Sequence, residues 1–432
     1  MSSSSHRILV VGNGGREHAL AWKLAASPRV AEIFVAPGNA GTALMSNVTN
    51  VAIGVEEIDA LVDFARDNAI TLTVVGPEAP LAIGLVDAFN VAGLACFGPT
   101  AAAAELEASK AFSKDFLARH SIPTAEYATF SDYAAAAAYI EQRGAPIVIK
   151  ADGLAAGKGV TLAQSVEQAL ASARDMLEDN AFGDAGARIV VEEFLTGEEA
   201  SFIAMVDGEH ILPLASSQDH KAAYDGDTGP NTGGMGAYSP APVVTDEIAE
   251  RVMHDVMQPT VAGLAADGRP FQGFLYAGLM IDAAGAPKVL EFNVRMGDPE
   301  TQPIMMRLDS DLLDLLEAAI VGRLDTVSAV WRDEVALGVV MTAGGYPGAY
   351  AKGNPITGLE RAAAEGVEVF HAGSQLDDSG QVVTSGGRVL CVCALGTDVA
   401  EAQARAYRGV AAIQWANVAY RRDIGHRAIG RL

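Results

Sequence analysis

Residues 146–160, P-I-V-I-K-A-D-G-L-A-A-G-K-G-V, combine lysines with closely spaced glycines. Lys150 ends a short apolar, β-branched run, which predicts a buried strand that carries one cation to a site. The second lysine, Lys158, stands among three glycines, whose backbone N–H groups can approach an anion because no Cβ is in the way. The segment therefore predicts a phosphate-binding loop, and a hairpin turn with solvated lysines is the alternative. The glycines are Gly153, Gly157 and Gly159.

Two common nucleotide-binding loops do not fit the chain. A Walker A loop needs one more residue between its glycines than Gly153 and Gly157 allow, and it has Ser or Thr where this chain has Gly159. The N-terminal segment R-I-L-V-V-G-N-G-G-R-E-H starts like a dinucleotide fingerprint, but Glu17 replaces the third glycine, and the next strand ends in P-G-N rather than in an acid. A dehydrogenase is therefore disfavoured, and a different nucleotide-binding fold is required.

Oxygen ligands for a metal are predicted at the end of a later strand. Residues 287–293 have the pattern of a strand, in which Glu291 and Asn293 point to the same face because side chains alternate. Carboxylate and amide oxygens suit Mg²⁺. Arg295 follows, where a cation would offset the charge that develops during phosphoryl transfer. A surface strand explains this pattern equally well when it is taken singly, but its position after the lysine loop favours the metal site.

Two segments between the loop and this strand have the composition of ligand sites. After a strand predicted at 188–192, the residues E-E-F-L-T-G-E-E-A-S-F offer backbone groups for an adenine edge and Glu199 for ribose hydroxyls. Residues 217–240 are too rich in Gly, Asp and Asn for a core element. This stretch is predicted to be a long functional loop.

A further site is predicted at one edge of an N-terminal parallel sheet. Strands are predicted at 7–12, 32–36 and 72–75, and residues 96–100 close a fourth strand. The carboxyl ends of parallel strands form one crevice, so the polar residues that follow them should converge there. The alternative is that they are only turn residues. They are Gly14, Arg16, Asn39 and Glu78.

The rest of the chain supplies the elements that position these residues. One helix is predicted across 107–117, with Lys110 and Lys114 on one face. Alanine-rich helices are predicted near 101–104 and 134–138, and another helix at 311–321. Beyond a boundary near 325–329, a small C-terminal sheet is predicted from strands at 336–343, 367–371, 381–384 and 389–394, with a closing helix at 399–413.

The composition describes a globular α/β enzyme. The 432 residues are 50% hydrophobic and 19% charged, with 45 glycines, which is typical of a chain of about two to four domains. The net charge of −24 argues against a nucleic-acid partner. No apolar run reaches the length of a membrane span, and the first residues lack a signal-peptide core, so no membrane partner and a cytoplasmic location are expected. The three cysteines form no disulfide or zinc motif, and Cys391 and Cys393 are expected as buried thiols on one strand face.

The order of these elements resembles the ATP-grasp ligases, and within them the phosphoribosylamine–glycine ligase family of purine biosynthesis. The most specific motif is R-M-G-D-P-E-T-Q-P at 295–303. Support over essentially the whole chain comes from G-N-G-G-R-E-H, A-P-G-N-A-G-T, G-P-E-A-P-L, K-A-D-G-L-A-A-G-K-G-V and G-P-N-T-G-G-M-G-A-Y-S-P. Two positions depart from the family pattern, because Ala222 stands where Arg is common and Met296 where Phe is usual. Neither is an expected metal or nucleotide ligand, so the departures concern substrate affinity rather than the reaction.

The resemblance implies an α/β, ATP-grasp fold of three domains. A Rossmann-like parallel-sheet (pre-ATP-grasp) domain is expected at 1–106, an ATP-grasp domain at 107–326 with a mobile α+β lid at 124–195, and a small α/β domain at 327–432. It implies ATP and Mg²⁺ or Mn²⁺ as cofactors, and glycine and 5-phosphoribosylamine as substrates that yield glycinamide ribonucleotide through glycyl phosphate. A closing lid suits an acyl phosphate, because water would hydrolyse it. The oligomeric state stays open, with a monomer as one possibility.

The resemblance also assigns residues to roles. ATP would contact Lys110, Lys150, Gly153, Gly157, Lys158, Gly159, Glu192, Glu193, Phe194, Leu195 and Glu199, and the metal would be bound by Glu291 and Asn293. The acceptor and the acyl phosphate would contact Asn13, Gly14, Gly15, Arg16, Gly38, Asn39, Pro77, Glu78, Asp219, Lys221, Arg295 and Gly297. Lys150, Lys158 and Arg295 are expected to be catalytic, because two anions must be brought together.

Two rival classes remain. Another ATP-grasp enzyme, such as a carboxylase or a different amino-acid ligase, would keep the nucleotide residues but should lack the motif at 295–303. A non-catalytic nucleotide-binding regulator would need none of Glu291, Asn293 and Arg295. Release of ADP with and without each substrate would separate the three classes.

Overall fold

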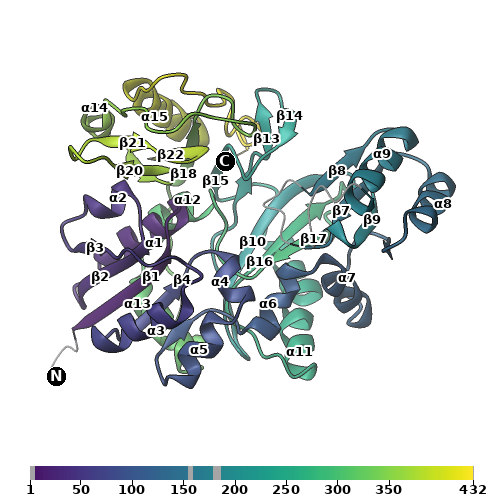
Figure 1. Ribbon diagram of the computed structural model, residues 1–432, viewed down its shortest axis with the longest axis horizontal. Helices are drawn as coiled ribbons and strands as arrows, with labels where there is room; N and C mark the ends of the chain where they lie inside the picture. Colours follow the sequence, from purple (N-terminus) through teal and green to yellow (C-terminus); the bar gives the residue numbers. More distant parts are fainter. Residues whose placement is uncertain (1–4, 154–158, 179–185, 432) are drawn as a thin grey trace.

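The N-terminal part of the chain is built on a parallel sheet of five strands, in a computed structural model that describes residues 5–153, 159–178 and 186–431. The strand order is β3-β2-β1-β4-β5, and Figure 1 labels the first four of these strands. The apolar run of the central strand is buried on both faces: Leu9 and Val11 face α3 and α5, and Ile8 and Val10 face α1. The elements are β1 (His6–Gly12), α1 (Gly15–Ala25), β2 (Val30–Pro37), β3 (Val48–Asn50), α3 (Ile58–Asp67), β4 (Leu72–Val75), α5 (Leu85–Val91) and β5 (Cys96–Phe97).

A central antiparallel sheet follows, with the order β11-β10-β16-β17. Its strands are β10 (Glu198–Asp207), β11 (Ile211–Pro213), β16 (Gln272–Ile281) and β17 (Pro287–Asn293). Side chains of β10 alternate between two cores: Phe202 packs with α10 (Asp246–Val252) and α11 (Gln258–Ala266), whereas Ile203 packs with α13 (Leu312–Ile320). The sheet therefore joins the N-terminal part to the helices that follow it.

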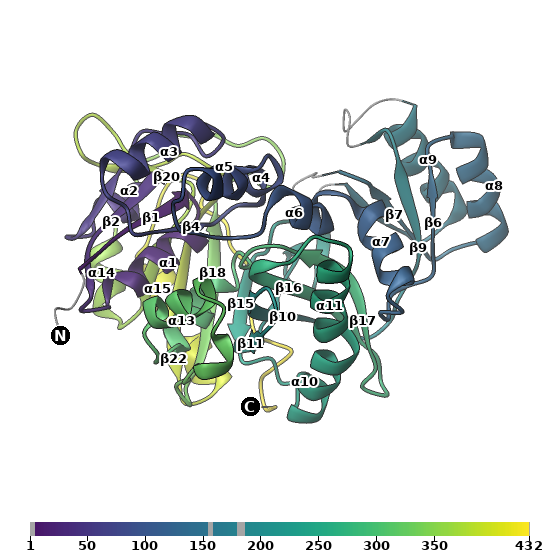
Figure 2. The same cartoon turned by 90° about the horizontal axis from the view of Figure 1, so that it is seen from below.

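A second antiparallel sheet, with the order β6-β9-β7-β8, projects from the rest of the molecule (Figures 1 and 2). Ile140, Ile149 and Val191 belong to its own small core. Thr124 pairs with Val289 of β17 at its base. This sheet occupies the expected lid region, whose mobility stays a prediction. Its elements are β6 (Tyr127–Phe130), α8 (Tyr133–Arg143), β7 (Ile147–Ala151), β8 (Val160–Ala163), α9 (Val166–Leu177) and β9 (Ile189–Glu193).

The single helix predicted at 107–117 is wrong. The structure has α6 (Ala101–Ala108) and α7 (Lys110–Arg119), separated at Ser109, whose backbone is extended with φ −130° and ψ 114°. The Ser109 hydroxyl accepts the Phe112 N–H and caps α7. The break places Glu107 at the end of α6, whereas Lys110 and Lys114 stay together on α7.

The prediction that 217–240 contains no core element is also wrong. Within it, β15 is fully buried and pairs with β18 in the five-stranded sheet β12-β15-β18-β22-β19, which also contains the C-terminal strands. The glycines that suggested a loop allow close packing instead, because a Cβ on Gly236 would lie 2.6 Å from the carbonyl oxygen of Gly338. The elements are β12 (Gln218–Asp219), β13 (Ala222–Tyr224), β14 (Thr228–Asn231), β15 (Gly236–Ser239), β18 (Val335–Thr342), β19 (Glu368–His371), β22 (Arg388–Gly396) and α15 (Val399–Ala412).

The C-terminal strands and closing helix lie close to their predicted positions. Cys391 and Cys393 are buried on one face of β22, as predicted, with their sulfur atoms 3.6 Å apart. No helix among the described residues is long and apolar enough to cross a membrane. Shorter elements near the site are α2 (Ala40–Ala43), α4 (Glu78–Ala82), α12 (Thr301–Arg307), α14 (Leu359–Ala364), β20 (Ser374–Leu376) and β21 (Val382–Thr384).

Candidate active site

Lys114, Lys150 and Glu192 form a buried charge cluster where the lid sheet meets the central sheet, which we call the nucleotide cluster. Nζ of Lys150 and Nζ of Lys114 each lie 3.0 Å from a different carboxylate oxygen of Glu192. Lys150 also donates to the Leu290 carbonyl at 3.0 Å, and Lys114 to the Thr124 hydroxyl at 2.7 Å. Burial would raise the pKa of Glu192, but the two lysines lower it below its usual value. Two cations against one anion leave an excess positive charge, which suits a polyphosphate.

The lysine loop begins beside this cluster. Nζ of Lys110 donates to the Gly153 carbonyl at 3.0 Å. Asp152 fixes the start of the loop, because its carboxylate accepts the Ala111 N–H at 2.7 Å and Nε of Arg188 at 2.9 Å. Lys110 and Gly153 therefore lie together, and their contact with a phosphate stays a prediction. Of the other predicted loop residues, Gly159 is buried, and Gly157 and Lys158 lie outside the described residues.

The residues predicted for adenosine follow β9. Phe194 and Leu195 are half-buried, and Glu193 is exposed and lies 3.5 Å from Nζ of Lys288. Glu199, on β10, lies 3.5 Å from Nζ of Lys221. The structure thus places these residues at the junction of the two antiparallel sheets, and their contact with a nucleotide stays a prediction.

Glu291 and Asn293 share one face of β17, as the strand alternation predicts. Asn293 is 8% exposed, and neither side chain has a hydrogen bond or an ion pair among the contacts of the described residues. A buried amide without a protein partner is expected to take a ligand. One carboxylate and one amide oxygen, both unpaired, fit the oxygen-rich coordination of Mg²⁺ or Mn²⁺.

Arg295 is held between two carboxylates. Its Nε lies 3.2 Å from Glu78 Oε2, and its Nη2 lies 2.9 Å from Glu107 Oε1. Glu107 also accepts the Val294 N–H at 2.7 Å. Burial raises the pKa of Glu107 to about 7, although Arg295 opposes the increase. The guanidinium therefore joins the N-terminal sheet edge, through Glu78, to the end of β17.

The segment after Arg295 packs on a second buried polar group. Glu300 accepts hydrogen bonds from the Ser201 hydroxyl at 3.0 Å and the Tyr276 hydroxyl at 2.8 Å. A Cβ on Gly297 would lie 2.5 Å from Glu300 Oε2. The space beside Gly297 is thus filled by this carboxylate. The two predicted residues Asp219 and Lys221 form an ion pair at 2.8 Å beside it.

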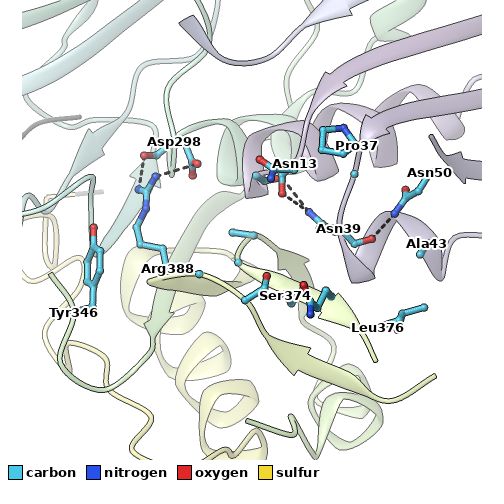
Figure 3. Close-up of a pocket in the computed structure, with 17 residues that line it drawn as sticks. Asn13, Pro37, Asn39, Ala43, Asn50, Asp298, Tyr346, Ser374, Leu376 and Arg388 are labelled. Atoms are coloured by element: carbon cyan, nitrogen blue, oxygen red, sulfur yellow. Dashed lines mark hydrogen bonds and ion pairs between the residues drawn. The ribbon is translucent and has the colours of Figure 1, made fainter. Parts of the chain in front are cut away.

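A cleft of about 690 Å³ separates the N-terminal sheet edge from the C-terminal domain (Figure 3). Asn13, Gly14, Gly38 and Asn39 line one side, as predicted, together with Pro37. Glycines and serines after β19 and β21 line the other side, namely Gly373, Ser374, Ser385 and Gly386. Arg388 closes one end, with Nη2 at 3.0 Å from Asp298 Oδ2. Backbone-rich walls with one ion pair suit a polar, hydrogen-bonding ligand.

Four residues predicted to contact the acceptor have structural roles in this fold, and their contact with a ligand stays a prediction. Gly15 and Arg16 are buried in α1, and Nη1 of Arg16 donates to the Met296 carbonyl at 3.2 Å. Pro77 precedes α4, away from the cleft lining, and positions Glu78 at the helix start. Asn39 lines the cleft, but its amide nitrogen donates to the His371 carbonyl at 2.8 Å and its oxygen caps α2.

A cluster of His220, Asp227 and His426 has ligand atoms close enough for a metal, but its hydrogen bonds argue for an anchor. Nε2 of His220 accepts the Gly425 N–H at 2.9 Å, which places the ring proton on Nδ1, the atom that faces Asp227. Arg421 and Arg427 reach Asp227 at 2.9 and 2.7 Å and supply the positive charge. The cluster therefore fastens the β13–β14 hairpin to the C-terminal segment.

Several site residues were missed from sequence. The sequence predicts Lys114 on the same helix face as Lys110 but indicates no role for it, and Asp298 and Glu300 lie inside the motif at 295–303 without a separate signal. Glu107 has no sequence signal, because it meets its partners only through the fold. The sequence at 385–388 indicates either a turn alone or a turn that borders the active site, and the structure places Arg388 of this turn in the cleft lining.

The fold and this arrangement define an ATP-grasp enzyme: a lid sheet and a central sheet enclose a lysine–glutamate cluster, with oxygen ligands and an arginine beyond it. The chain belongs to the phosphoribosylglycinamide synthetase family. Residues 6–107 match the N domain of that family, residues 108–301 its ATP-grasp (A) domain, and residues 336–427 its C domain. The expected family and fold are confirmed. The family implies use of ATP with a divalent metal.

Relatives match over the whole chain. The phosphoribosylamine–glycine ligase of Vibrio cholerae serotype O1 is 63% identical over 425 residues, covering 98% of this chain and 99% of the relative, and that of Escherichia coli K12 is 64% identical with the same coverage. The crystal structure of phosphoribosylamine–glycine ligase from Thermotoga maritima superposes with a TM-score of 0.85 at 34% identity, covering 97% of this chain and all of that one. A biotin carboxylase from Campylobacter jejuni, at 12% identity and a TM-score of 0.72 over 96% of this chain and 93% of its own, shares the fold.

Proposed function

We propose that the chain joins glycine to 5-phosphoribosylamine and forms glycinamide ribonucleotide, ADP and phosphate through glycyl phosphate, in purine biosynthesis. The observation that carries this proposal is the position of Arg295. It lies just after the unpaired oxygen ligands of β17 and contacts Glu78 at the N-terminal sheet edge. A phosphoryl group delivered from the nucleotide and an amine held at the sheet edge would therefore meet at this guanidinium.

ATP would bind across the nucleotide cluster. Glu192 neutralises Lys150 and Lys114 in part, and the triphosphate would take over one or both of these lysines, with Lys110 next to the loop. Backbone groups at 193–195 would contact the adenine and Glu199 the ribose. The lid at 124–195, within an ATP-grasp domain at 107–326, would close on the nucleotide and exclude water from the acyl phosphate.

Glu291 and Asn293 would hold Mg²⁺, or Mn²⁺ in its place, because their oxygens are unpaired and share one strand face. When bound, such an ion supplies charge that stabilises the transferred phosphoryl group. Arg295 adds a fixed cation on the acceptor side. The guanidinium cannot lose its proton in this setting, since the pKa of arginine is far above neutrality, so its role is electrostatic.

The phosphoribosyl group would occupy the cleft between the N-terminal domain (1–106) and the C-terminal domain (327–432). Gly14 and Gly38 present backbone, and Asn13 presents an exposed amide to this space. The amine would then point toward Glu78, where its attack on glycyl phosphate releases phosphate and forms the amide. A protein with this chemistry and no membrane-spanning helix among its described residues is expected in the cytoplasm.

The test measures ADP release by the full-length chain with ATP and Mg²⁺. Rapid release should need both glycine and 5-phosphoribosylamine, the latter generated in place because it is unstable. Alanine in place of glycine should be much slower, since one extra methyl group in a closed site costs about 1 to 3 kcal/mol. Rapid release with bicarbonate, or with another amino acid and no amine, would overturn the substrate assignment and leave the ATP-grasp fold intact.

A further inference from the structure

The two carboxylate oxygens of Glu107 contact the two residues that follow β17, Val294 and Arg295. Oε1 lies 2.9 Å from Nη2 of Arg295, and Oε2 accepts the Val294 N–H at 2.7 Å. The side chain is 8% exposed and stands at the end of α6, next to the break at Ser109. Because one bond goes to the backbone and one to the side chain, Glu107 fixes the direction in which Arg295 leaves the strand.

Arg295 has a second carboxylate partner of a different kind. Glu78 contacts Nε at 3.2 Å, and its side chain is 30% exposed at the sheet edge where the acceptor amine is expected. Glu78 is therefore accessible to a ligand, whereas Glu107 is not. An amine that bound Glu78 would compete with Arg295 for it, and Glu107 would remain the buried anion next to the guanidinium.

We propose that Glu107 is a positioning residue. It keeps the Arg295 guanidinium directed at the phosphoryl-transfer site when Glu78 binds the amine of the second substrate. This inference rests on the proposed function. Without the negative charge at position 107, Glu78 is the nearer carboxylate for the guanidinium. The Arg295 guanidinium would then stay paired with Glu78 and move with it. It would no longer protect the acyl phosphate from hydrolysis, and it would obstruct the approach of the amine. Glycyl phosphate would hydrolyse more often before it reacts.

The observable is the ratio of ADP released to glycinamide ribonucleotide formed, which is one when every acyl phosphate is captured. Glu107→Gln is the main variant, because the amide oxygen can still accept the Val294 N–H while the charge is lost. We expect the ratio to rise to about two or more and kcat to fall about tenfold. The affinity for ATP should stay within about twofold, since Glu107 has no contact with the nucleotide cluster among the described residues.

Glu105→Gln is the matched control. Glu105 lies on the same helix, two residues earlier, and pairs with Arg269 instead of with the site. This variant should keep a ratio of one and an unchanged kcat. Assays are run at pH 8, where the Glu107 carboxyl, with a pKa raised by burial to about 7, is ionised. ADP is followed by a coupled assay and product by incorporation of labelled glycine.

The outcomes separate this inference from the proposed function. A ratio that rises in Glu107→Gln but not in Glu105→Gln supports the positioning role, whereas a ratio of one together with a lower melting temperature shows a structural role and overturns it. If Glu107→Gln does not fold, Glu107→Met decides, because it also removes the charge while keeping the length of the side chain: a ratio above one supports the inference and a ratio of one overturns it. If the unmodified chain forms no glycinamide ribonucleotide, the proposed function itself fails.

Discussion

The nucleotide cluster and the interdomain cleft are two polar sites built in opposite ways. In the cluster, three charged side chains pair at 3.0 Å and are almost fully buried. The cleft is an open space of about 690 Å³ whose walls are mostly backbone, glycine, asparagine and serine, with one ion pair at its end. A ligand that binds in the cluster must replace existing ion pairs. A ligand that binds in the cleft enters a space that is already formed. Removal of one charge should therefore have a larger effect in the cluster.

The largest effect is expected from Lys150→Met. Among the described residues, this change leaves Glu192 buried with Lys114 as its one remaining lysine partner. It would also remove the proposed charge-assisted contact to the triphosphate. We expect the Kd for ATP to rise about 100-fold, or about 2.7 kcal/mol. Calorimetric titration with a non-hydrolysable ATP analogue measures it.

The exposed Lys352 provides the control, since Lys352→Met should leave ATP binding unchanged. The KM for 5-phosphoribosylamine should change much less than the Kd for ATP in Lys150→Met. Equal weakening of both would mean that the cluster and the cleft are not separate sites, and the comparison would fail.

Glu291→Gln should reduce turnover at least about tenfold, because the proposed charged metal ligand is replaced by a nearly isosteric neutral one. The fold should persist, since no hydrogen bond of Glu291 is present among the described residues. Initial rates across a series of Mg²⁺ concentrations measure the loss and show whether more metal restores activity. The exposed Glu360→Gln is the control. Normal turnover at ordinary Mg²⁺ would remove Glu291 from the metal site.

The two sites also differ in how far the sequence predicts them. Lys150, Gly153, Glu291 and Asn293 sit in short motifs whose spacing already implies a strand, a loop or a shared face, and the structure places them accordingly. The cleft needs β1, β2, β19 and β21, which are far apart in the chain. Nothing local to Arg388 indicates that it meets Asp298.

The errors in predicted secondary structure have physical causes. Ser109 breaks a helical pattern because its hydroxyl caps the next helix. Gly236 lies in a buried strand because Gly338 of the neighbouring strand comes too close for a Cβ. In both cases tertiary contacts decided between local alternatives that the sequence alone left nearly equal.

In the cleft, Arg388→Gln should raise the KM for 5-phosphoribosylamine about tenfold, or about 1.4 kcal/mol, and leave the Kd for ATP unchanged. The charge is lost at the end of the cleft, and Nη1 no longer ties the Asp298 carbonyl, which it contacts at 2.6 Å. Steady-state kinetics with each substrate varied measure the change. Arg405→Gln, in an exposed pair with Glu401 on α15, is the control. A matching loss of ATP affinity would show that Arg388 acts through the fold rather than through the cleft.

The remaining prediction concerns the stability of the scaffold beneath the cleft and its response to pH. Burial, aided by the nearby His371, lowers the pKa of His18 from 6.5 to about 3, and burial lowers that of His371 to about 4. Nδ1 of His18 accepts the His371 N–H at 2.8 Å, so the neutral ring is the folded form. Each folded pKa lies below its unfolded value, so the unfolded chain binds more protons. The contribution of these two histidines to stability is therefore complete above about pH 6.5 and falls as the pH decreases toward 4, by up to about 1.4 kcal/mol per pH unit for each histidine.

His371→Gln removes one of these two titrations. Its free energy of unfolding, measured by urea titration from pH 8 to 4.5, should therefore decline less steeply than that of the unmodified chain. His254→Gln, at a side chain that is 84% exposed, should leave the slope unchanged. If the free energy of unfolding had the same slope against pH in His371→Gln and His254→Gln, His371 would not be neutral in the folded state. The pair of His18 and His371 beneath the cleft would then carry charge.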